Sequence, residues 1–170
     1  TTTLPRSSSI GGFNTCNVQL STVREVSVGL GLTEVMNFSL VSDELLYDSM
    51  RRRPPLILEV ESPKTREHRV LRDQLIPSLL STLSKNIHEE YPQRIFEVAK
   101  VFVADGRKPM RIREDYHVAA SFTHMDAGFS EAKSYLTALM KQAFNMQVEA
   151  KATSDPSFTL GRAAEVRLKG

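Results

Sequence analysis

The sequence predicts an α+β fold in which an antiparallel β-sheet is flanked by helices. Segments with helical periodicity alternate irregularly with segments rich in β-branched and aromatic residues. Several connections between neighbouring strand candidates are too short for the crossover that parallel strands need. The chain has 170 residues, of which 41% are hydrophobic, and this is enough to bury a sizeable core.

Composition narrows the possible compartments and partners. The formal net charge is +2 with 25% charged residues, so the overall balance demands neither nucleic acid nor an acidic substrate. The single cysteine, Cys16, excludes an intramolecular disulfide and suits a reducing compartment. No apolar run approaches the roughly 18 residues of a membrane span, and the first residues lack the apolar stretch of a signal peptide. We therefore expect a cytoplasmic protein without a membrane partner.

A linker and a helix are expected at the start of the chain. Residues 1–15 are rich in Thr, Ser and Gly, which predicts a linker, and residues 16–170 are expected to form one module. Helical periodicity runs from Val18 to Gly31, and Gly31 is suited to end the helix. This helix has two opposite apolar stripes, one with Leu20, Val23, Val26 and Leu30 and the other with Val18, Val28 and Leu32. Such a helix is expected to be buried on two sides.

Three short elements are predicted next. Residues 33–42 have the β-branched and aromatic residues of a strand. Asp43 is suited to cap a short helix over residues 43–50, which ends at the run RRRPP. Residues 56–62, LILEVES, are expected to form a second strand, which Pro63 ends.

The segment 71–86, LRDQLIPSLLSTLSKN, predicts a helix that opens at Asp73 or Gln74. Pro77 falls in its first turn, where a missing backbone N–H costs little. Five side chains share the apolar face of this helix: Ile76, Leu79, Leu80, Leu83 and Ile87.

The second half of the chain predicts a hairpin, a helix and two more strands. Residues 94–106 are apolar on both sides, which is typical of a central strand, and residues 115–124 are expected to pair with them antiparallel. Residues 129–144 form the clearest helix, with a stripe of Phe129, Ala132, Leu136, Leu139, Met140, Ala143 and Phe144. Residues 146–152 and 163–169 are expected to be strands. Because the sequence stops directly after the second of these, we expect the module to be truncated at its C-terminus.

The motifs favour no catalytic, cofactor-binding or metal site. Four histidines are scattered without HxxxH or HExxH spacing: His68, His88, His117 and His124. The glycine pairs lack the context of a phosphate-binding loop. Cys16 is interpreted as a small buried hydrophobe rather than a nucleophile.

Two charged features remain. Glu97 lies in the middle of a strand that is expected to be buried, so its carboxylate must be paired, and Arg72 or Arg94 could supply the positive charge. We interpret this as a structural ion pair rather than as a catalytic base. The runs RRRPP, KTREHR and GRKPMRIR could form a basic patch for RNA phosphates, but solvated loops are the simpler interpretation.

Residues 63–102, PKTREHRVLRDQLIPSLLSTLSKNIHEEYPQRIFEVAKVF, closely resemble a segment of phenylalanyl-tRNA synthetase β subunits. EYPQRIFEVAKV is most similar to the archaeal and eukaryotic branch. The resemblance extends upstream through VREVSVGLGLTEVMNFSLVS and downstream to DPSFTLGRAAEVRLKG. Ala99 departs from the family, which usually has Gly there, and Ala127-Gly128 lies in a divergent hairpin.

The resemblance implies a copy of the class II synthetase sheet that has lost catalysis. It implies a heterotetramer with the α subunit, whose holoenzyme uses ATP, Mg²⁺ and tRNA, and no cofactor in this fragment. Class II chemistry needs an Arg for the ATP α-phosphate, but the corresponding strand has Lys100 and no FRxE motif. Arg162 is not followed by the helix that a second phosphate-binding Arg would need. We therefore predict no activity for this chain alone.

The resemblance also implies roles for single residues. It marks Arg72, Pro77 and Asn86 as parts of a framework helix, with Arg72 anchored to the sheet through Glu97 and Asn86 at the helix end. In class II synthetases the first helix packs across a subunit interface. One stripe of the first helix is therefore expected to face the α subunit, and the interface candidates are Val18, Val23, Val26, Val28 and Leu30.

Two other functions stay open. A free-standing RNA-binding module would use the basic loops and bind tRNA with a salt-dependent affinity. A stand-alone enzyme descended from synthetases would catalyse ATP-pyrophosphate exchange, although the missing phosphate-binding arginines disfavour it.

Overall fold

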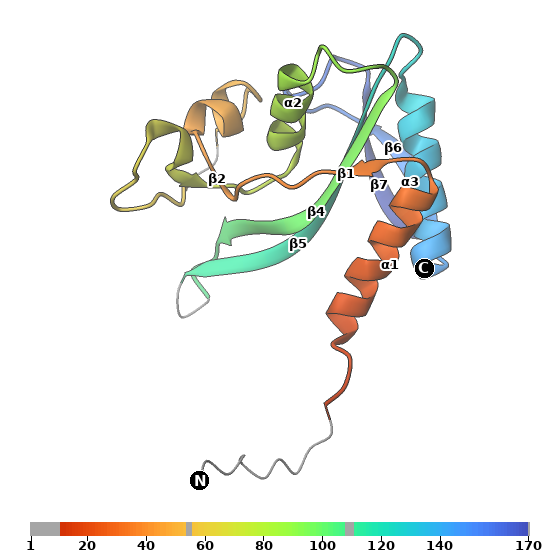
Figure 1. Cartoon of the computed structure of the whole chain (residues 1–170), viewed down its shortest axis with the longest axis horizontal. Coiled ribbons are helices and arrows are strands. Elements are labelled where there is room, and N and C mark those ends of the chain that lie inside the picture. Colours follow the sequence, from red (N-terminus) through yellow and green to blue (C-terminus); the bar gives the residue numbers. More distant parts are fainter. Residues whose placement is uncertain (1–10, 54–55, 108–110, 170) are drawn as a thin grey trace.

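The structure is a computed structural model that describes residues 11–53, 56–107 and 111–169. A long, curved β-hairpin, residues 93–123, crosses the middle of the molecule (Figure 1). Two helices lie on one side of it, and a smaller lobe, which contains the short elements between residues 40 and 71, lies on the other. The expected α+β class is confirmed. Within the described residues, no helix is both long and apolar enough to cross a membrane.

The central sheet has three strands in the order β1–β4–β5. β4 (Gln93–Ala104) and β5 (Ile112–Thr123) are antiparallel over their whole lengths, with Glu97 opposite Ala119. β1 (Thr33–Glu34) joins the other side of β4 in the parallel direction. The prediction that the long strand is central is confirmed, whereas the short parallel pair departs from the expected antiparallel arrangement.

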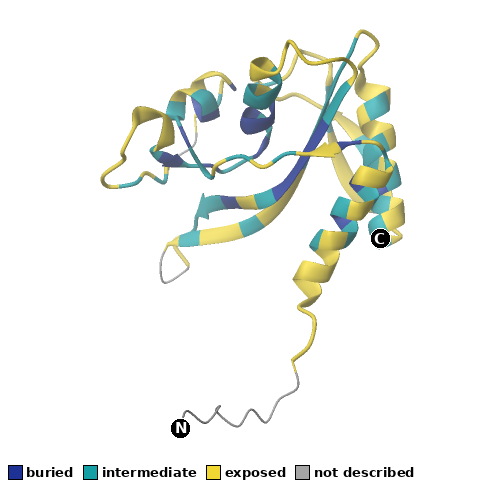
Figure 2. Ribbon diagram, viewed as in Figure 1, coloured by how far each residue is buried: buried dark blue, intermediate teal, exposed yellow. Residues whose placement is uncertain are grey.

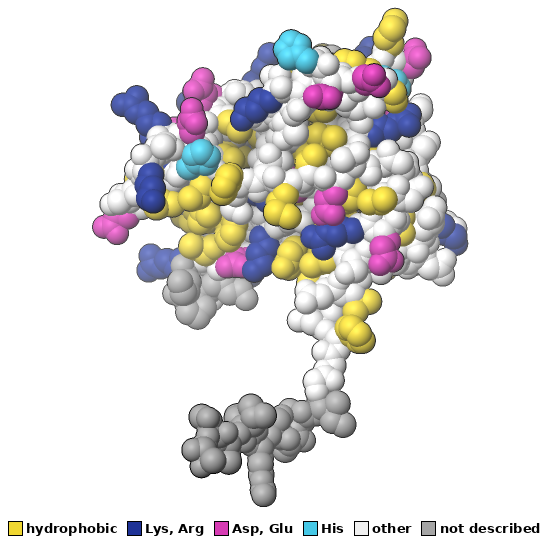
Figure 3. Space-filling model, viewed as in Figure 1, with side chains coloured by type: hydrophobic (Ala, Val, Ile, Leu, Met, Phe, Trp, Pro, Cys, Tyr) yellow, Lys and Arg dark blue, Asp and Glu magenta, His cyan; other side chains and the backbone are white. Residues whose placement is uncertain are grey.

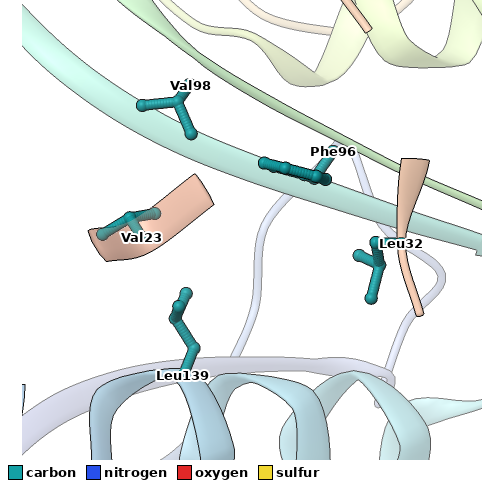
Figure 4. Packing of buried hydrophobic residues seen from close by; sticks show 5 residues of the cluster. All are labelled: Val23, Leu32, Phe96, Val98 and Leu139. Carbon is teal, nitrogen blue, oxygen red and sulfur yellow. The ribbon is translucent and has the colours of Figure 1, made fainter. Parts of the chain in front are cut away.

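Two helices, α1 (Thr15–Gly29) and α3 (Phe129–Phe144), cover one face of this sheet. The main core lies between these helices and the strands, and Figure 4 shows five of its side chains: Val23, Leu32, Phe96, Val98 and Leu139. Successive residues of a strand point to opposite faces, so Glu97 points away from this core. The sheet therefore has an apolar face under α1 and α3 and a second face with a buried charge.

A polar contact links the two helices inside this core. Ser27 is fully buried on α1, and its Oγ lies 2.9 Å from the hydroxyl of Tyr135 on α3. Burial raises the pKa of Tyr135, an effect that the Ser27 hydrogen bond partly opposes. The Tyr135 ring also packs edge-on against Phe122 of β5, with ring centroids 5.5 Å apart. The contact therefore holds α1, α3 and β5 together.

α1 begins at Thr15 rather than at Val18. Asn14 caps it, because the Asn14 Oδ1 accepts a hydrogen bond of 2.9 Å from the backbone N–H of Cys16. Gly31 follows the helix with a φ of +84°, a conformation that favours glycine, as expected for a helix end. The first half of α1 is largely exposed (Figure 2). Of the expected linker, residues 1–10 lie outside the described residues.

The strand expected over residues 33–42 is wrong as a single element. Only β1 and β2 (Leu40–Val41) are strands, and they belong to different sheets. The segment between them leaves the sheet because Asn37 turns toward Glu97, to which both its backbone N–H and its side-chain amide donate. A buried carboxylate thus overrides the local strand propensity.

The smaller lobe also differs from expectation. β2 pairs antiparallel with β3 (Val70–Leu71), whereas the strand expected over residues 56–62 contributes only a bridge from Glu59 to Val70. The short helix expected over residues 43–50 is a single π-helical turn, η1 (Glu44–Asp48). A 3₁₀ turn, η2 (Arg66–His68), precedes β3.

Asp43 occupies the N-terminal cap position of η1, as predicted, but its side chain makes no capping hydrogen bond. The Oγ of Ser42 accepts a 3.1 Å hydrogen bond from the backbone N–H of Leu45. Asp43 instead lies 3.6 Å from the guanidinium of Arg69. Serine and aspartate are both good capping residues, so residue type alone could not choose between these neighbours.

α2 (Ile76–Lys85) starts later than predicted, with Leu75 before its first turn. Pro77 lies in that first turn, as expected. Leu79 is fully buried, whereas Leu80 and Ile87 are 46% and 56% exposed. The predicted apolar face was therefore too wide.

The chain ends in a hairpin of β6 (Gln147–Thr153) and β7 (Ala163–Lys169), which form an antiparallel sheet of their own. Both strands were expected, but not their separation from the central sheet. α3 leads into β6 through Asn145, which has a φ of +54°.

Candidate functional site

A buried ion pair joins the segment between β3 and α2 to strand β4 of the central sheet. Arg72 follows β3, and its Nη1 lies 2.7 Å from Oε1 of Glu97, with both side chains almost fully buried. The N–H direction is poorly aligned with the carboxylate oxygen, so this contact is an ion pair rather than a regular hydrogen bond. The Arg72 Nε donates to the Lys100 carbonyl at 3.3 Å. The structure thus uses Arg72, not Arg94, as the partner of Glu97.

The backbone of Arg72 is also tied to both neighbouring segments. Its N–H donates to the carbonyl of Ser39 at 3.0 Å, and its carbonyl accepts from the N–H of Phe102 at 2.9 Å. Phe102 belongs to β4, so Arg72 extends one end of the central sheet on the side of β1. This backbone pairing places the guanidinium next to Glu97.

Two residues that the sequence interpretation missed complete this cluster. The Asn37 Nδ2 donates to Glu97 Oε2 at 2.9 Å, and the Thr82 hydroxyl donates to Asn37 Oδ1 at 2.9 Å. Because Thr82 lies on α2, this chain of contacts connects the helix to the buried carboxylate. Nothing in the residue types of Asn37 and Thr82 distinguishes them from surface residues, so only the fold brings them together.

Asn86 closes α2 through the same region. It occupies the C-terminal cap position, and its Nδ2 donates to the Thr82 carbonyl at 2.7 Å. Its own carbonyl accepts from Gln93 Nε2 at 2.8 Å, which ties the helix end to the start of β4. Arg72, Glu97, Asn37, Thr82 and Asn86 therefore form one connected polar network, which we call the framework network.

Asp73, next to Arg72, has a separate partner. Arg52 donates from Nη1 to Oδ1 and from Nη2 to Oδ2 of Asp73, both at 3.1 Å, which is the bidentate geometry of a guanidinium and a carboxylate. Burial, with a smaller contribution from the Asp73 carboxylate, raises the pKa of Tyr47 to about 12. Asp73 therefore binds Arg52 of the basic run at 51–53 and does not cap α2.

Arg94 belongs to another cluster, at the start of α3. Its guanidinium lies 2.8 Å from Glu131 Oε1, and Glu131 Oε2 lies 2.6 Å from His124 Nε2. The hydrogen bond from His124, followed by the charges of His124 and Arg94, lowers the pKa of the Glu131 carboxyl. These contacts fasten the end of β5 to the first turn of α3.

The five interface candidates, four on α1 and Leu30 directly after it, do not share one surface. Val23 is 4% exposed and belongs to the core, and Val26 and Leu30 pack against that core. Val18 and Val28 are 47% and 57% exposed. Leu32, assigned to the second stripe, is also in the core. Only Val18 and Val28 of the candidates can therefore contribute much area to a partner surface.

The cysteine and the basic runs that were singled out in the sequence do not form a common site in the described residues. Cys16 is exposed, contrary to the expectation that it is buried. In the basic runs, Arg69 and Arg113 pair with carboxylates of their own neighbourhoods, and residues 108–110 lie outside the described residues. Charges of both signs are scattered among hydrophobic side chains on the face shown in Figure 3. In the part of the chain that the structure describes, no group of three His, Cys, Asp or Glu residues could hold a metal ion.

Comparison with known proteins places these features in a family. The model of the phenylalanyl tRNA synthetase beta chain CLM domain matches residues 1–170. The phenylalanine-tRNA ligase beta subunit of Archaeoglobus fulgidus is 36% identical over 170 residues, which cover 98% of this chain and 30% of that protein. The beta subunit of Methanocaldococcus jannaschii is 34% identical, with 95% of this chain and 29% of that protein covered. The chain thus spans about 30% of the length of these curated relatives.

The fold comparison agrees. A pyrrolysyl tRNA synthetase from Desulfitobacterium hafniense superimposes with a TM-score of 0.63 at 13% identity, covering 89% of this chain and 52% of that one. At this identity the likeness concerns the fold alone. The chain belongs to the family of the phenylalanyl tRNA synthetase beta chain CLM domain.

Proposed function

We propose that this chain is a non-catalytic, scaffold-like part of the beta subunit of a phenylalanine-tRNA ligase. The observation that carries the proposal is the family match over the whole chain, together with 36% identity to an archaeal beta subunit. The module, predicted over residues 16–170, would also include Asn14 and Thr15, which begin α1, so the proposed linker would end before Asn14. The module would pack against the alpha subunit in a cytoplasmic heterotetramer, whose complete form uses ATP and Mg²⁺ to attach phenylalanine to tRNA.

The chemistry of the central strand supports the lack of catalysis. A triphosphate needs cations that are free to face it. At the middle of β4 stands Glu97, an acid whose charge is already matched by Arg72. Lys100 lies 2.6 Å from Glu114 and is likewise engaged. The residues on this strand therefore do not fit an ATP site, and no step through ATP is assigned to this chain.

The framework network is proposed to be the device that keeps this face closed. In it, α2 is linked to the buried carboxylate of Glu97 through Thr82 and Asn37, and Arg72 pairs with that carboxylate. A module held rigid in this way suits a role in assembly, because a preorganised surface loses little conformational freedom on binding.

Val18 and Val28 are the proposed contribution of α1 to the alpha-subunit surface. Both are β-branched apolar residues with about half of their surface exposed. Their partners on the same helix, Val23 and Ser27, are buried against the core and α3. One side of α1 thus serves the module's own core, and the other stays available for a second subunit.

The test is ATP-pyrophosphate exchange with phenylalanine, measured for the chain alone and for a matched alpha subunit together with its complete beta subunit. The proposal predicts exchange by the complete enzyme and none above background by the chain. Exchange by purified chain that is abolished by Lys100→Ala would contradict it, because a stand-alone synthetase needs its own phosphate-binding cations.

A further inference from the structure

Two hollows adjoin each other on the loop between β6 and β7. One has a volume of about 470 Å³ and reaches Arg51, and the other has about 950 Å³ and reaches Lys133 and Arg162. They share the walls formed by Asp155, Phe158 and Gly161. Both volumes are in the range of ordinary ligand sites.

Residues that are far apart in the sequence are held together at this place. The Ser157 hydroxyl donates to the carbonyl of Met50 at 2.8 Å, which joins the loop to the basic run at 51–53. The Arg51 N–H donates to the Asp48 carbonyl at 3.0 Å, so the backbone beside the hollow is fixed. The loop and the basic run therefore form one surface, although about a hundred residues separate them in the chain.

The charge at this surface is mainly positive and available. Arg51, Lys133 and Arg162 are exposed, and within the described residues none of them has an ion-pair partner. The one carboxylate, Asp155, accepts the backbone N–H of Ser157 at 2.8 Å, and this hydrogen bond lowers its pKa. It serves the loop's own turn, and the three cations remain for an anionic partner.

Two aromatic rings accompany the cations. Phe158 lines both hollows and Phe129 lines the larger one, and each is 52% exposed. Thr153 adds a hydroxyl to both hollows. Exposed rings beside unpaired cations are the combination that binds single-stranded nucleic acid, because phosphates meet the cations while unstacked bases lie on the rings.

We propose that this surface, formed by Arg51, Lys133, Arg162, Phe129 and Phe158, binds single-stranded RNA. The choice of RNA rests on the proposed function, since a tRNA ligase meets RNA. The separate basic runs seen in the sequence do not make this surface. The fold makes it from one residue of the first run, one exposed lysine of α3 and the loop before β7.

The test is fluorescence anisotropy of a labelled oligouridine of about 12 nucleotides with the 170-residue chain. Arg51→Glu/Arg162→Glu is expected to weaken binding more than about tenfold and to lower the slope of log affinity against log salt by about two. Lys64→Glu/Arg66→Glu makes the same change in net charge at exposed residues of the smaller lobe, and should weaken binding less than about threefold.

A second variant tests the stacking component. Phe158→Ala leaves every charge in place and is expected to weaken binding about tenfold, with the salt slope unchanged. Arg162→Gln alone, expected to weaken binding about threefold, keeps the test readable if the double variant does not fold. Equal losses for the two charge-reversed pairs, no effect of Phe158→Ala, or equally tight binding of duplex RNA would each overturn the proposal. None of these measurements involves the alpha subunit, so failure here is distinct from failure of the assembly role.

Discussion

At the scale of single residues, the framework network contains two buried charged side chains, Arg72 and Glu97. The side chains of Arg72 and Glu97 are 2% and 1% exposed, so neither charge is solvated by bulk water. A buried charge is tolerated only when it is paired and hydrogen-bonded, and Glu97 has Arg72 on one oxygen and the Asn37 amide on the other. Desolvation of the two charges offsets much of their attraction, so the pair adds little net stability. Removing only one partner is strongly destabilising, because the other charge is then left buried and unpaired.

Replacing Arg72 by Leu should therefore be strongly destabilising. It leaves the Glu97 charge buried without a cation, and a loss of about 3–5 kcal/mol in the free energy of unfolding is expected. Urea denaturation followed by circular dichroism measures it. Arg94→Leu is the matched control, because it breaks the part-exposed pair with Glu131 and should cost no more than about 1 kcal/mol. A loss below about 0.5 kcal/mol for Arg72→Leu would show that the pair does not anchor the sheet.

The Glu131 cluster predicts a dependence of stability on acid. The pKa of Glu131 is lower in the folded chain than its ordinary value of 4.5, mainly because His124 donates a hydrogen bond to it. A lowered carboxyl pKa contributes stability above the unfolded value, and this contribution is lost as the pH falls through the folded value.

The measurement compares the wild-type chain with Glu131→Gln. The difference in urea midpoint between the two should be largest near neutral pH and should shrink as the pH falls below the ordinary carboxyl value of 4.5 and through the lowered pKa of Glu131 in the folded chain. A difference that stays constant from pH 7 to pH 3 would mean that the Glu131 charge is not coupled to folding.

Single residues also show where sequence reasoning stops. Glu97 could be predicted as a paired buried acid because an ionisable residue stood between apolar ones in a long strand. Asn37 and Thr82 could not, since polar residues of these types are common on surfaces and their partners are distant in the chain. The residue pattern left Arg72 and Arg94 both open and only the family resemblance favoured Arg72, whose backbone pairing beside β4 places it next to Glu97.

At the scale of elements, α2 shows how burial differs between adjacent leucines. Leu79 is fully buried, and Leu80 is 46% exposed. Leu79→Ala should lower the free energy of unfolding by about 2–5 kcal/mol, because it removes buried methyl groups and leaves a cavity. Leu80→Ala should cost less than about 1 kcal/mol, since alanine also favours the helix. Similar losses for both variants, measured by thermal or urea unfolding, would contradict the packing of α2 described above.

Long elements were predictable and short ones were not. β4, β5 and α3 each have a dozen or more residues, so their hydrophobic period repeats often enough to fix their type and approximate position, although β5 begins at Ile112, three residues before its predicted start. β1, β2 and β3 have two residues each, which is too short for any period. Their pairing depends on distant contacts, such as the hydrogen bonds of Asn37 to Glu97.

At the scale of the whole molecule, the α+β class could be inferred from the order of elements, but the division into separate sheets could not. β6 and β7 are regular strands by pattern, and they pair with each other instead of joining β5. The exposure of the α1 side chains was also only partly predictable. The two-sided apolar pattern of α1 was real, but Val23 is used by the chain's own core and only the exposed Val18 and Val28 face outward.

We propose that the module assembles with an alpha subunit. The most direct measurement is co-expression of the 170-residue chain with the matching alpha subunit, followed by size-exclusion chromatography with light scattering. We expect a mixed complex that Val28→Asp weakens, while circular dichroism shows that the variant chain stays folded. Ser134→Asp, an exposed change on α3, should leave the complex intact. If the folded chain elutes alone beside the alpha subunit, or if Val28→Asp has no more effect than Ser134→Asp, the proposed role of α1 in assembly is contradicted.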